Sequence, residues 1–285
     1  MKQLIRKLFT QPFLEKLFFI PVIKEFIRFL IPGNKLYSQN SFRICERNGV
    51  KYELDLSEYM DHFVYYNGTT EERNLMFSSV VKGMVILDIG ANIGDTAFNF
   101  CKYTGATGMV YAFEPVDTTF NKLRKNASLN NFQNIQIFNV ALSDKKEELV
   151  FGYSWNQNSS AILMRKSVLE TNSNMGKATA ISLDEFLAEN KINKVDFIKL
   201  DVEGFEKFVL TGASKTLTEF KPILYVEVSD STLKKNNSSA KDLIELIVNY
   251  GYYLTNARSG KIISLNEDFD NIHTDVLCHP VIKNK

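Results

Sequence analysis

The chain has 285 residues, of which 45% are hydrophobic and 24% are charged, and its formal net charge is +1. This composition is typical of a globular protein with a large core, and a near-neutral charge gives no global electrostatic reason to expect a nucleic-acid partner. The three cysteines, Cys45, Cys101 and Cys278, are far apart and follow no metal-binding spacing, so we predict neither a disulfide framework nor a zinc site.

The first 31 residues differ from the rest of the chain. Apolar residues recur at helical spacing in successive stretches, with breaks near Pro12 and Pro21. Six basic residues against two acidic ones give the segment a charge of +4. Charges and prolines interrupt it too often for a membrane span, which needs ~20 mostly apolar residues. Two interpretations stay open: helices packed on the rest of the protein or on a second subunit, or helices lying on an anionic membrane surface.

The pattern changes after this segment. Residues 41–56 alternate around Asn48-Gly49, which predicts a β-hairpin, and residues 71–81 are expected to form a helix that leads into the core. The predicted organisation is an N-terminal amphipathic helical extension over residues 1–36, a hairpin and helix over 37–82, and the main domain over 83–285.

The main domain begins with the stretch Met84–Asp95. A short apolar run ends in Asp88, a turn containing Gly90 and Gly94 follows, and a helical pattern starts near Thr96. The succession of strand, tight turn and helix is the first unit of a nucleotide-type α/β domain. We expect glycine at both positions because a side chain would keep the backbone away from a ligand. Asp88 falls at the carboxyl end of the strand, where open α/β sheets bind their ligands.

The spacing of the glycines separates two kinds of cofactor. Dinucleotide sites use G-x-G-x-x-G, whereas these glycines are spaced G-x-x-x-G and follow an acid. A carboxylate would repel a pyrophosphate but attract an ammonium or a sulfonium, and S-adenosylmethionine carries both. Glu114 ends the next apolar run, where a carboxylate can accept hydrogen bonds from both hydroxyls of a ribose. These residues predict an S-adenosylmethionine site and disfavour an NAD-dependent oxidoreductase.

From residue 84 onward, apolar runs alternate with helical patterns. We expect strands over residues 84–88, 109–114, 135–140, 148–153, 195–200, 223–228, 252–255 and 276–279, and helices over 95–103, 117–129, 183–190, 205–211 and 240–250. This alternation predicts an α/β fold with a mostly parallel sheet and helices on both faces. The intervening residues 154–178 are expected to be irregular, and their Trp155 fits either a sugar contact or a surface loop with one buried aromatic.

Polar residues follow the expected strands at one edge of the sheet. They are Asp88, Glu114, Asn139, Ser143, Asp144, Asp201 and Glu227. A carboxylate from Asp201 or Glu203 could remove a proton from an acceptor hydroxyl, orient that hydroxyl, or help to hold a divalent cation. Glu203 could instead cap the helix that follows. We interpret Asp196 and Lys199 as strand-start and surface residues without a role.

Five short motifs together resemble the FkbM family of S-adenosylmethionine-dependent methyltransferases, over about residues 71–253. They are LDIGANIGD (Leu87–Asp95), FEP (Phe113–Pro115), ALSD (Ala141–Asp144), SLDEF (Ser182–Phe186) and IKLDVEGFE (Ile198–Glu206). The resemblance implies a class I, Rossmann-like methyltransferase fold, in which the last strand of a seven-stranded sheet is antiparallel. It also implies O-methylation of a hydroxyl on a sugar, a glycan or a natural product.

The same resemblance implies roles for individual residues. Asp88, Gly90, Asn92 and Gly94 would line the methionine end of the cofactor, Glu114 would hold the ribose, and Ser143 and Asp144 would lie near the adenine. Asp201 and Glu203 would face the transferred methyl group, and either would serve as the base, with Glu227 in reserve. We assign no metal ligand and leave a divalent metal open.

Two rival functions stay open. A nucleic-acid methyltransferase is disfavoured because Asp201-Val202-Glu203 stands where N6-adenine enzymes typically have an Asn/Asp-Pro-Pro-Tyr motif and C5-cytosine enzymes a Pro-Cys. A non-catalytic scaffold subunit is disfavoured by the intact glycines and acids. The expected partners are a small-molecule or glycan acceptor, a membrane surface through residues 1–31, and a second copy in a homo-oligomer, but no nucleic acid. We expect the protein in the cytoplasm, with peripheral contact at the inner membrane face.

Overall fold

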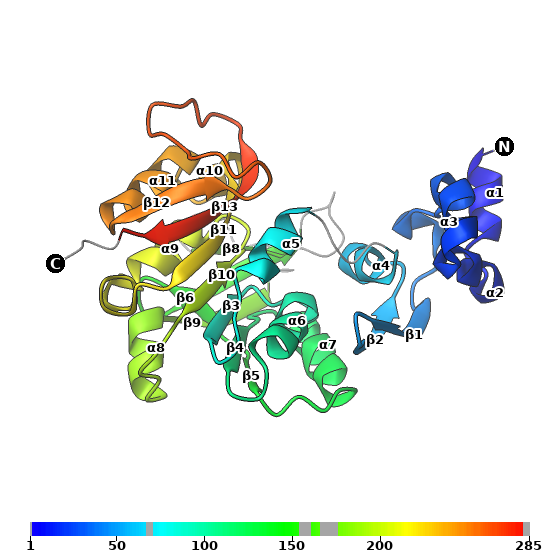
Figure 1. Ribbon diagram of the computed structural model, residues 1–285, viewed down its shortest axis with the longest axis horizontal. Helices are drawn as coiled ribbons and strands as arrows, with labels where there is room; N and C mark the ends of the chain where they lie inside the picture. Colours follow the sequence, from blue (N-terminus) through cyan, green and yellow to red (C-terminus); the bar gives the residue numbers. More distant parts are fainter. Residues whose placement is uncertain (1, 67–70, 154–160, 166–175, 282–285) are drawn as a thin grey trace. The chain divides into compact units, whose positions relative to one another are not determined.

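The computed structural model describes residues 2–66, 71–153, 161–165 and 176–281. They form two compact units, one within residues 2–66 and the other within residues 71–281 (Figure 1). Helix α5 (Glu71–Ser78), which leads into the core, therefore belongs to the larger unit. In the described ranges, no helix is both long enough and apolar enough to cross a membrane.

The smaller unit begins with short helices that follow the prolines. Helix α1 spans Lys2–Leu8, α2 spans Pro12–Glu15 and α3 spans Pro21–Ile27. Pro12 and Pro21 open their helices, where the missing N–H of proline costs no hydrogen bond, so the predicted breaks are confirmed. The predicted hairpin is also confirmed, with β1 (Phe42–Arg47) and β2 (Val50–Asp55) joined by Asn48 and Gly49 at φ +52° and +72°. Helix α4 (Tyr59–Tyr66) completes the unit.

A buried ion pair joins the helices of the smaller unit to its hairpin. The side chain of Glu15 in α2 is fully buried, and both of its oxygens accept hydrogen bonds of 2.8 Å from the Arg43 guanidinium of β1. The Tyr65 hydroxyl donates to the same carboxylate at 3.3 Å. Because its partners are all internal, Glu15 adds no negative charge to the surface of these helices.

The larger unit is built on a seven-stranded sheet. Its strands are β3 (Val85–Ile89), β4 (Met109–Phe113), β5 (Ile135–Phe138), β10 (Phe197–Leu200), β11 (Ile223–Ser229), β12 (Tyr252–Asn256) and β13 (His273–Pro280). The strand order is β12-β13-β11-β10-β3-β4-β5, and β13 alone runs antiparallel to its neighbours β11 and β12. This order and the reversed β13 confirm the predicted class I methyltransferase fold.

Helices lie on both faces of this sheet, as predicted (Figure 1). They are α5 (Glu71–Ser78), α6 (Asp95–Thr104), α7 (Asp117–Ser128), α8 (Leu183–Glu189), α9 (Glu206–Thr211), α10 (Asp230–Lys235) and α11 (Ala240–Asn249). The short helix α10 follows β11 directly and was not predicted, because six residues are too few to show a helical period.

A second, four-stranded sheet corrects the expectation of an irregular insert. Its strands are β6 (Ala141–Ser143), β7 (Glu147–Tyr153), β8 (Ala161–Arg165) and β9 (Gly176–Ser182), in the order β6-β9-β7-β8. Strands β8 and β9 both pair antiparallel with β7. These runs are strands because of that pairing, and they are too short for an alternation of apolar and polar residues to be recognised in the sequence. Trp155 lies outside the described residues, and so does the sugar contact suggested for it.

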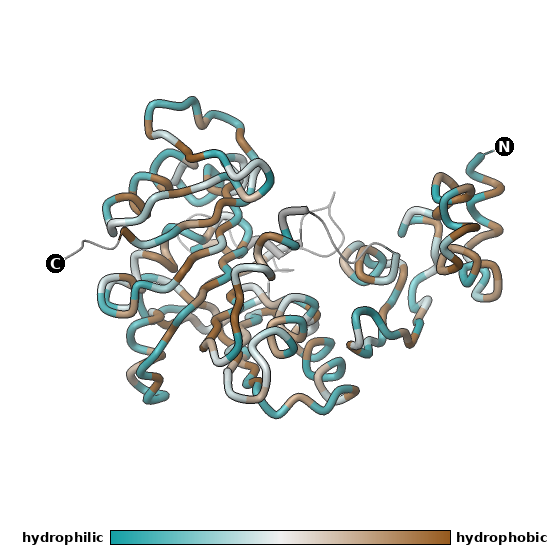
Figure 2. The backbone as a smooth tube through the Cα atoms, in the orientation of Figure 1, coloured by the Kyte–Doolittle hydropathy of each residue, from teal (hydrophilic) through white to brown (hydrophobic). Residues whose placement is uncertain are grey.

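The register of the main sheet gives its two faces different characters. Leu87, Ile198 and Leu224 are paired across β3, β10 and β11, and all three belong to the apolar core. One residue further along, Asp88, Lys199 and Tyr225 are paired across the same strands and share the opposite face. Figure 2 shows the apolar strands of the larger unit. The polar residues on the face of Asp88, Lys199 and Tyr225 lie near the carboxyl ends of these strands.

Candidate active site

The turn after β3 needs glycine for reasons of packing. Gly90, Asn92 and Gly94 all adopt positive φ angles, of +83°, +49° and +96°. A Cβ atom on Gly90 would overlap the carbonyl oxygen of Asp201, and one on Gly94 would overlap the ring of Phe98. The close approach of the chain at the end of β10 therefore explains Gly90, and the ligand approach expected from the sequence stays a prediction.

Glu114 lies at the end of β4 and faces the same turn. Its Oε2 accepts a hydrogen bond of 3.0 Å from the backbone N–H of Asn92, and its Oε1 accepts one of 3.0 Å from the N–H of Val116. Each oxygen keeps a second lone pair for a ligand. Burial raises the pKa of Glu114 to about 7, although the two N–H donors oppose the rise. The sequence-predicted turn and acid are thus joined by a hydrogen bond.

Asp88 is fully buried at the end of β3. Its Oδ2 accepts a hydrogen bond of 2.6 Å from the Thr96 hydroxyl, and its Oδ1, which has no hydrogen-bond partner among the described residues, lies 3.6 Å from Nζ of Lys199. Burial raises the pKa of Asp88, and the Lys199 ammonium and the Thr96 hydroxyl oppose that rise. Asp88 therefore contacts two groups of the protein itself, the Thr96 hydroxyl and the Lys199 ammonium.

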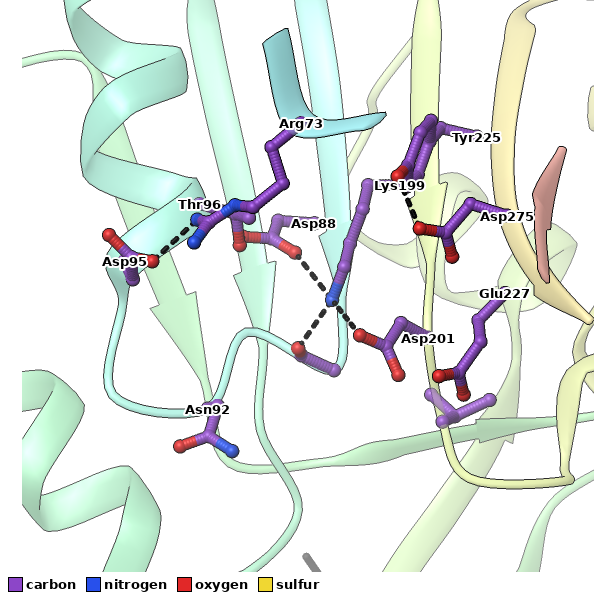
Figure 3. Close-up of polar contacts among 12 residues, drawn as sticks. Arg73, Asp88, Asn92, Asp95, Thr96, Lys199, Asp201, Tyr225, Glu227 and Asp275 are labelled. Atoms are coloured by element: carbon purple, nitrogen blue, oxygen red, sulfur yellow. Dashed lines mark hydrogen bonds and ion pairs between the residues drawn. The ribbon is translucent and has the colours of Figure 1, made fainter. Parts of the chain in front are cut away.

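Lys199 is central to this edge of the sheet, and its interpretation as a surface residue was wrong. It is 5% exposed, and its Nζ donates to the Gly90 carbonyl at 2.8 Å and lies 3.3 Å from Oδ2 of Asp201 (Figure 3). Burial lowers the pKa of Lys199, but the carboxylates of Asp201 and Asp88 outweigh burial and hold it above its ordinary value. Asp196, in contrast, does lie at the start of β10, where it accepts from the Val85 N–H at 2.7 Å.

A group of acids lies at the ends of β10, β11 and β13. Asp201 and Glu227 come from neighbouring strands, and Asp275 is the register partner of Glu227 on β13 (Figure 3). The Tyr225 hydroxyl donates to Asp275 at 2.6 Å. Burial and the charges of Asp201 and Glu203 raise the pKa of Glu227 to about 10. The raised pKa favours the protonated form of Glu227, which can donate a hydrogen bond.

Glu203 has an unusual backbone conformation. Its φ is +54°, a region that few residues other than glycine adopt and that is enriched at functional sites. The side chain that binds the backbone before α9 is Glu206, whose Oε1 accepts from the N–H groups of Val202 and Gly204 at 3.1 Å each. Glu206 thus accepts the backbone hydrogen bonds at the start of α9, the capping role that was considered for Glu203. Burial raises the pKa of Glu206 to about 7.

Ser143 and Asp144 lie at the end of β6 in the smaller sheet. The Ser143 hydroxyl bonds to Glu147 at 2.8 Å and to Asp144 at 3.1 Å, and Arg165 bonds to both acids. Asn139, which was noted in the sequence without an assigned role, donates to the Glu114 carbonyl at 3.0 Å. The role of Ser143 and Asp144 beside an adenine stays a prediction.

The sequence did not identify several residues of this region. Arg73 of α5 forms an ion pair of 2.5 Å with Asp95 at the start of α6, and Tyr225 and Asp275 come from β11 and β13 (Figure 3). Lys199 carried a usable signal, since a lysine inside a short apolar strand calls for a buried partner. In the part of the chain that the structure describes, no group of three or more His, Cys, Asp or Glu side chains is arranged to hold a metal ion.

Comparison with known proteins assigns the chain to a family. Residues 88–254, more than half of the chain, match the Methyltransferase FkbM domain. The protein belongs to the FkbM methyltransferase family. It is 27% identical over 179 residues to the 2-O-methyltransferase NoeI of Sinorhizobium fredii, an alignment that covers 58% of this chain and 72% of NoeI. It is also 27% identical over 177 residues to Methyltransferase 1 of Beauveria bassiana, covering 56% and 70% of the two chains.

Solved structures give more distant likenesses. An FkbM methyltransferase from Methylobacillus flagellatus aligns with a TM-score of 0.45 and 16% identity, over 77% of this chain and 52% of that one. This chain therefore spans about half the length of that protein. The fold assignment rests on the strand order described above. With the family established, this FkbM protein is an S-adenosylmethionine-dependent methyltransferase.

Proposed function

We propose that this methyltransferase acts on a hydroxyl group of a sugar or glycan. The observation that supports this acceptor class is the group of acids Asp201, Glu203, Glu227 and Asp275 at one edge of the sheet. Carboxylates accept hydrogen bonds, and a polyhydroxyl acceptor supplies many donors. The name of NoeI, a 2-O-methyltransferase, favours an oxygen atom as the methyl acceptor.

The cofactor site in this proposal comprises the turn and the acids around it. Asp88, Gly90, Asn92 and Gly94 serve the methionine end, Glu114 binds the ribose, and Ser143 and Asp144 serve the adenine. The fit of Glu114 is supported by its two lone pairs that remain after the bonds from Asn92 and Val116. Bound there, S-adenosylmethionine supplies a methyl group on a positively charged sulfur.

The protein must also remove the proton of the acceptor hydroxyl. The base is a carboxylate, Asp201 or Glu203, and the Lys199 ammonium lies 3.3 Å from Asp201. Its raised pKa suits Glu227 to donating a hydrogen bond to the acceptor rather than to removing the acceptor's proton. General-base catalysis of this kind contributes roughly 10²–10⁴-fold.

The acceptor class is tested with radiolabelled S-adenosylmethionine and a panel of methyl glycosides, with bulk tRNA as the rival acceptor. We expect label in the glycosides as an O-methyl ether, and a loss of about 10²-fold or more in Asp201→Asn or Glu203→Gln if that residue is the base. Labelling of tRNA alone would contradict the proposal. A rate that neither substitution changes would contradict the assignment of the base.

We also propose that the N-terminal helices rest on an anionic membrane surface. Helix α1 has no buried residue, and Leu4 and Leu8 are 77% and 60% exposed. Phe13 of α2 and Phe26 of α3 are 69% and 74% exposed. Figure 2 shows hydrophobic and hydrophilic stretches alternating along these helices. Exposed apolar side chains beside basic residues, with Glu15 neutralised internally, suit anionic lipid headgroups.

Co-sedimentation with vesicles tests this contact. We expect the full chain to pellet with phosphatidylglycerol vesicles more than with phosphatidylcholine vesicles, and Phe13→Ser/Phe26→Ser to abolish the difference. Ile262→Ser is the matched control, because Ile262 is 71% exposed in the larger unit. Equal pelleting of the wild type, the double variant and Ile262→Ser with both kinds of vesicle would contradict the membrane contact. A dimer that only the double substitution dissociates would assign these helices to a second subunit instead.

A further inference from the structure

The Lys199 ammonium connects three parts of the candidate site. It donates to the Gly90 carbonyl in the turn, and it lies 3.3 Å from the Asp201 carboxylate and 3.6 Å from the Asp88 carboxylate (Figure 3). Its side chain is 6% exposed. A charge buried to this degree is stable only where nearby acceptors compensate for the water it has lost. These contacts make Lys199 part of the site's geometry, although it points away from solvent.

The two acids beside Lys199, Asp88 and Asp201, differ in solvent exposure. The side chain of Asp88 is fully buried, with one oxygen bonded to Thr96 and the other facing Lys199. The side chain of Asp201 is 42% exposed. Because a ligand contacts atoms that solvent can also reach, the accessible acid of the pair is Asp201.

We propose that Lys199 is a positioning residue through which the buried Asp88 acts. Asp88 holds the ammonium in place, and the ammonium fixes the Gly90 carbonyl and the Asp201 carboxylate. Asp88 thus serves the methionine end of the cofactor indirectly, Asp201 is the carboxylate that faces it, and Glu203 is left as the base. This inference rests on the proposed cofactor site. Two carboxylates and one ammonium leave a single net negative charge, which complements the single net positive charge of S-adenosylmethionine.

The inference is tested by calorimetric titration of the full chain with S-adenosylmethionine. We expect Lys199→Met and Asp88→Asn each to weaken binding at least tenfold. The double variant should lie within threefold of Lys199→Met alone, because two residues that act through one contact are not additive. Lys194→Met is the matched control, since this lysine is 61% exposed and pairs with Asp196, and it should bind as the wild type does.

A second variant does not depend on the buried pair. Asp201→Asn changes a partly exposed side chain and keeps an oxygen acceptor beside Lys199, so it should fold and bind S-adenosylmethionine with full stoichiometry but at least tenfold more weakly. A merely structural role for Lys199 would lower the melting temperature and the binding stoichiometry but leave the Kd of the folded protein unchanged.

Three results would overturn the inference. The first is wild-type affinity for S-adenosylmethionine in Lys199→Met. The second is a double variant whose fold-loss of affinity equals the product of the fold-losses of the two single variants. The third is wild-type affinity in Asp201→Asn. The last applies even if the Lys199 variants fail to fold. A wild-type protein that does not bind S-adenosylmethionine at all would overturn the proposed cofactor site itself, and this inference with it.

Discussion

The two units of this protein depart from the usual pattern of burial in opposite directions. At the edge of the main sheet, charged groups that normally face water are buried, among them Asp88, Glu114 and Lys199. On the N-terminal helices, apolar side chains that normally lie inside are exposed, among them Leu4, Val22 and Phe26. A buried charge needs a partner, and an exposed apolar face gains from a cover.

The difference between the units lies in where those partners are found. The buried charges are compensated within the chain, by the Asp88–Lys199–Asp201 contacts and by the N–H donors to Glu114. The exposed apolar residues have no such cover in the part of their unit that the structure describes. This difference is what the two proposals require, a small ligand at the sheet edge and a membrane surface on the helices. Substitutions in each unit, and a pH series, test this difference.

The largest effect is expected from a pair of phenylalanines in the smaller unit. Phe18 is 1% exposed and Phe26 is 74% exposed. Phe18→Ala should lower the free energy of unfolding by about 3–5 kcal/mol, because it leaves a cavity in the core. Phe26→Ala should change it by less than about 0.5 kcal/mol. Urea titrations of the two variants measure this, and a large loss in Phe26→Ala would show that its side chain is covered within the protein.

The next effect concerns the turn after β3. Gly90→Ala should lower the free energy of unfolding by about 2–5 kcal/mol, because the new Cβ overlaps the Asp201 carbonyl and φ is +83°. Gly33→Ala is the control, since a Cβ atom there meets no neighbouring atom. Thermal melts followed by circular dichroism compare the two. A Gly90→Ala protein as stable as the wild type would mean that the turn tolerates other backbone conformations.

The smallest effect is the pH dependence of stability without cofactor. Burial raises the pKa of Glu114 from 4.5 to about 7. A raised carboxyl pKa stabilises the folded state below about pH 4.5, and this contribution is lost as the pH rises through about 7. The loss amounts to at most about 3 kcal/mol for a shift of this size. Denaturant titrations from pH 5 to pH 8 should therefore show a shallower decline in Glu114→Gln than in the wild type.

The control for the pH series is Glu185→Gln, which changes an exposed glutamate in α8. It should decline with pH as the wild type does. Identical slopes in all three proteins would show that Glu114 titrates normally in the folded state.

Periodicity was sufficient to predict most of the main sheet. The runs that became β3, β4, β10 and β11 are short, apolar and bounded by turn residues, so each could be recognised locally. The hairpin at Asn48-Gly49 was equally local. The acids that end these strands could be assigned to one edge, because parallel strands bring their carboxyl ends together.

The rest depended on contacts between distant segments. The apolar strand around Lys199 indicates a buried partner, but that partner is Asp88, more than a hundred residues earlier in the chain, and only the register of the two strands identifies it. Asp275 joins the acids because β13 pairs antiparallel with β11, and strands β8 and β9 exist because they pair with β7. A pattern of period two or 3.6 carries no information about such partners.

We propose that this edge of the sheet binds S-adenosylmethionine through Glu114 and the glycine turn. Calorimetric titration of the wild type and Glu114→Gln, with S-adenosylmethionine and with NAD, tests this proposal. We predict saturable binding of S-adenosylmethionine to the wild type, binding at least tenfold weaker to Glu114→Gln, and no binding of NAD. Equal affinity of the two proteins for S-adenosylmethionine, or saturable binding of NAD, would contradict the account.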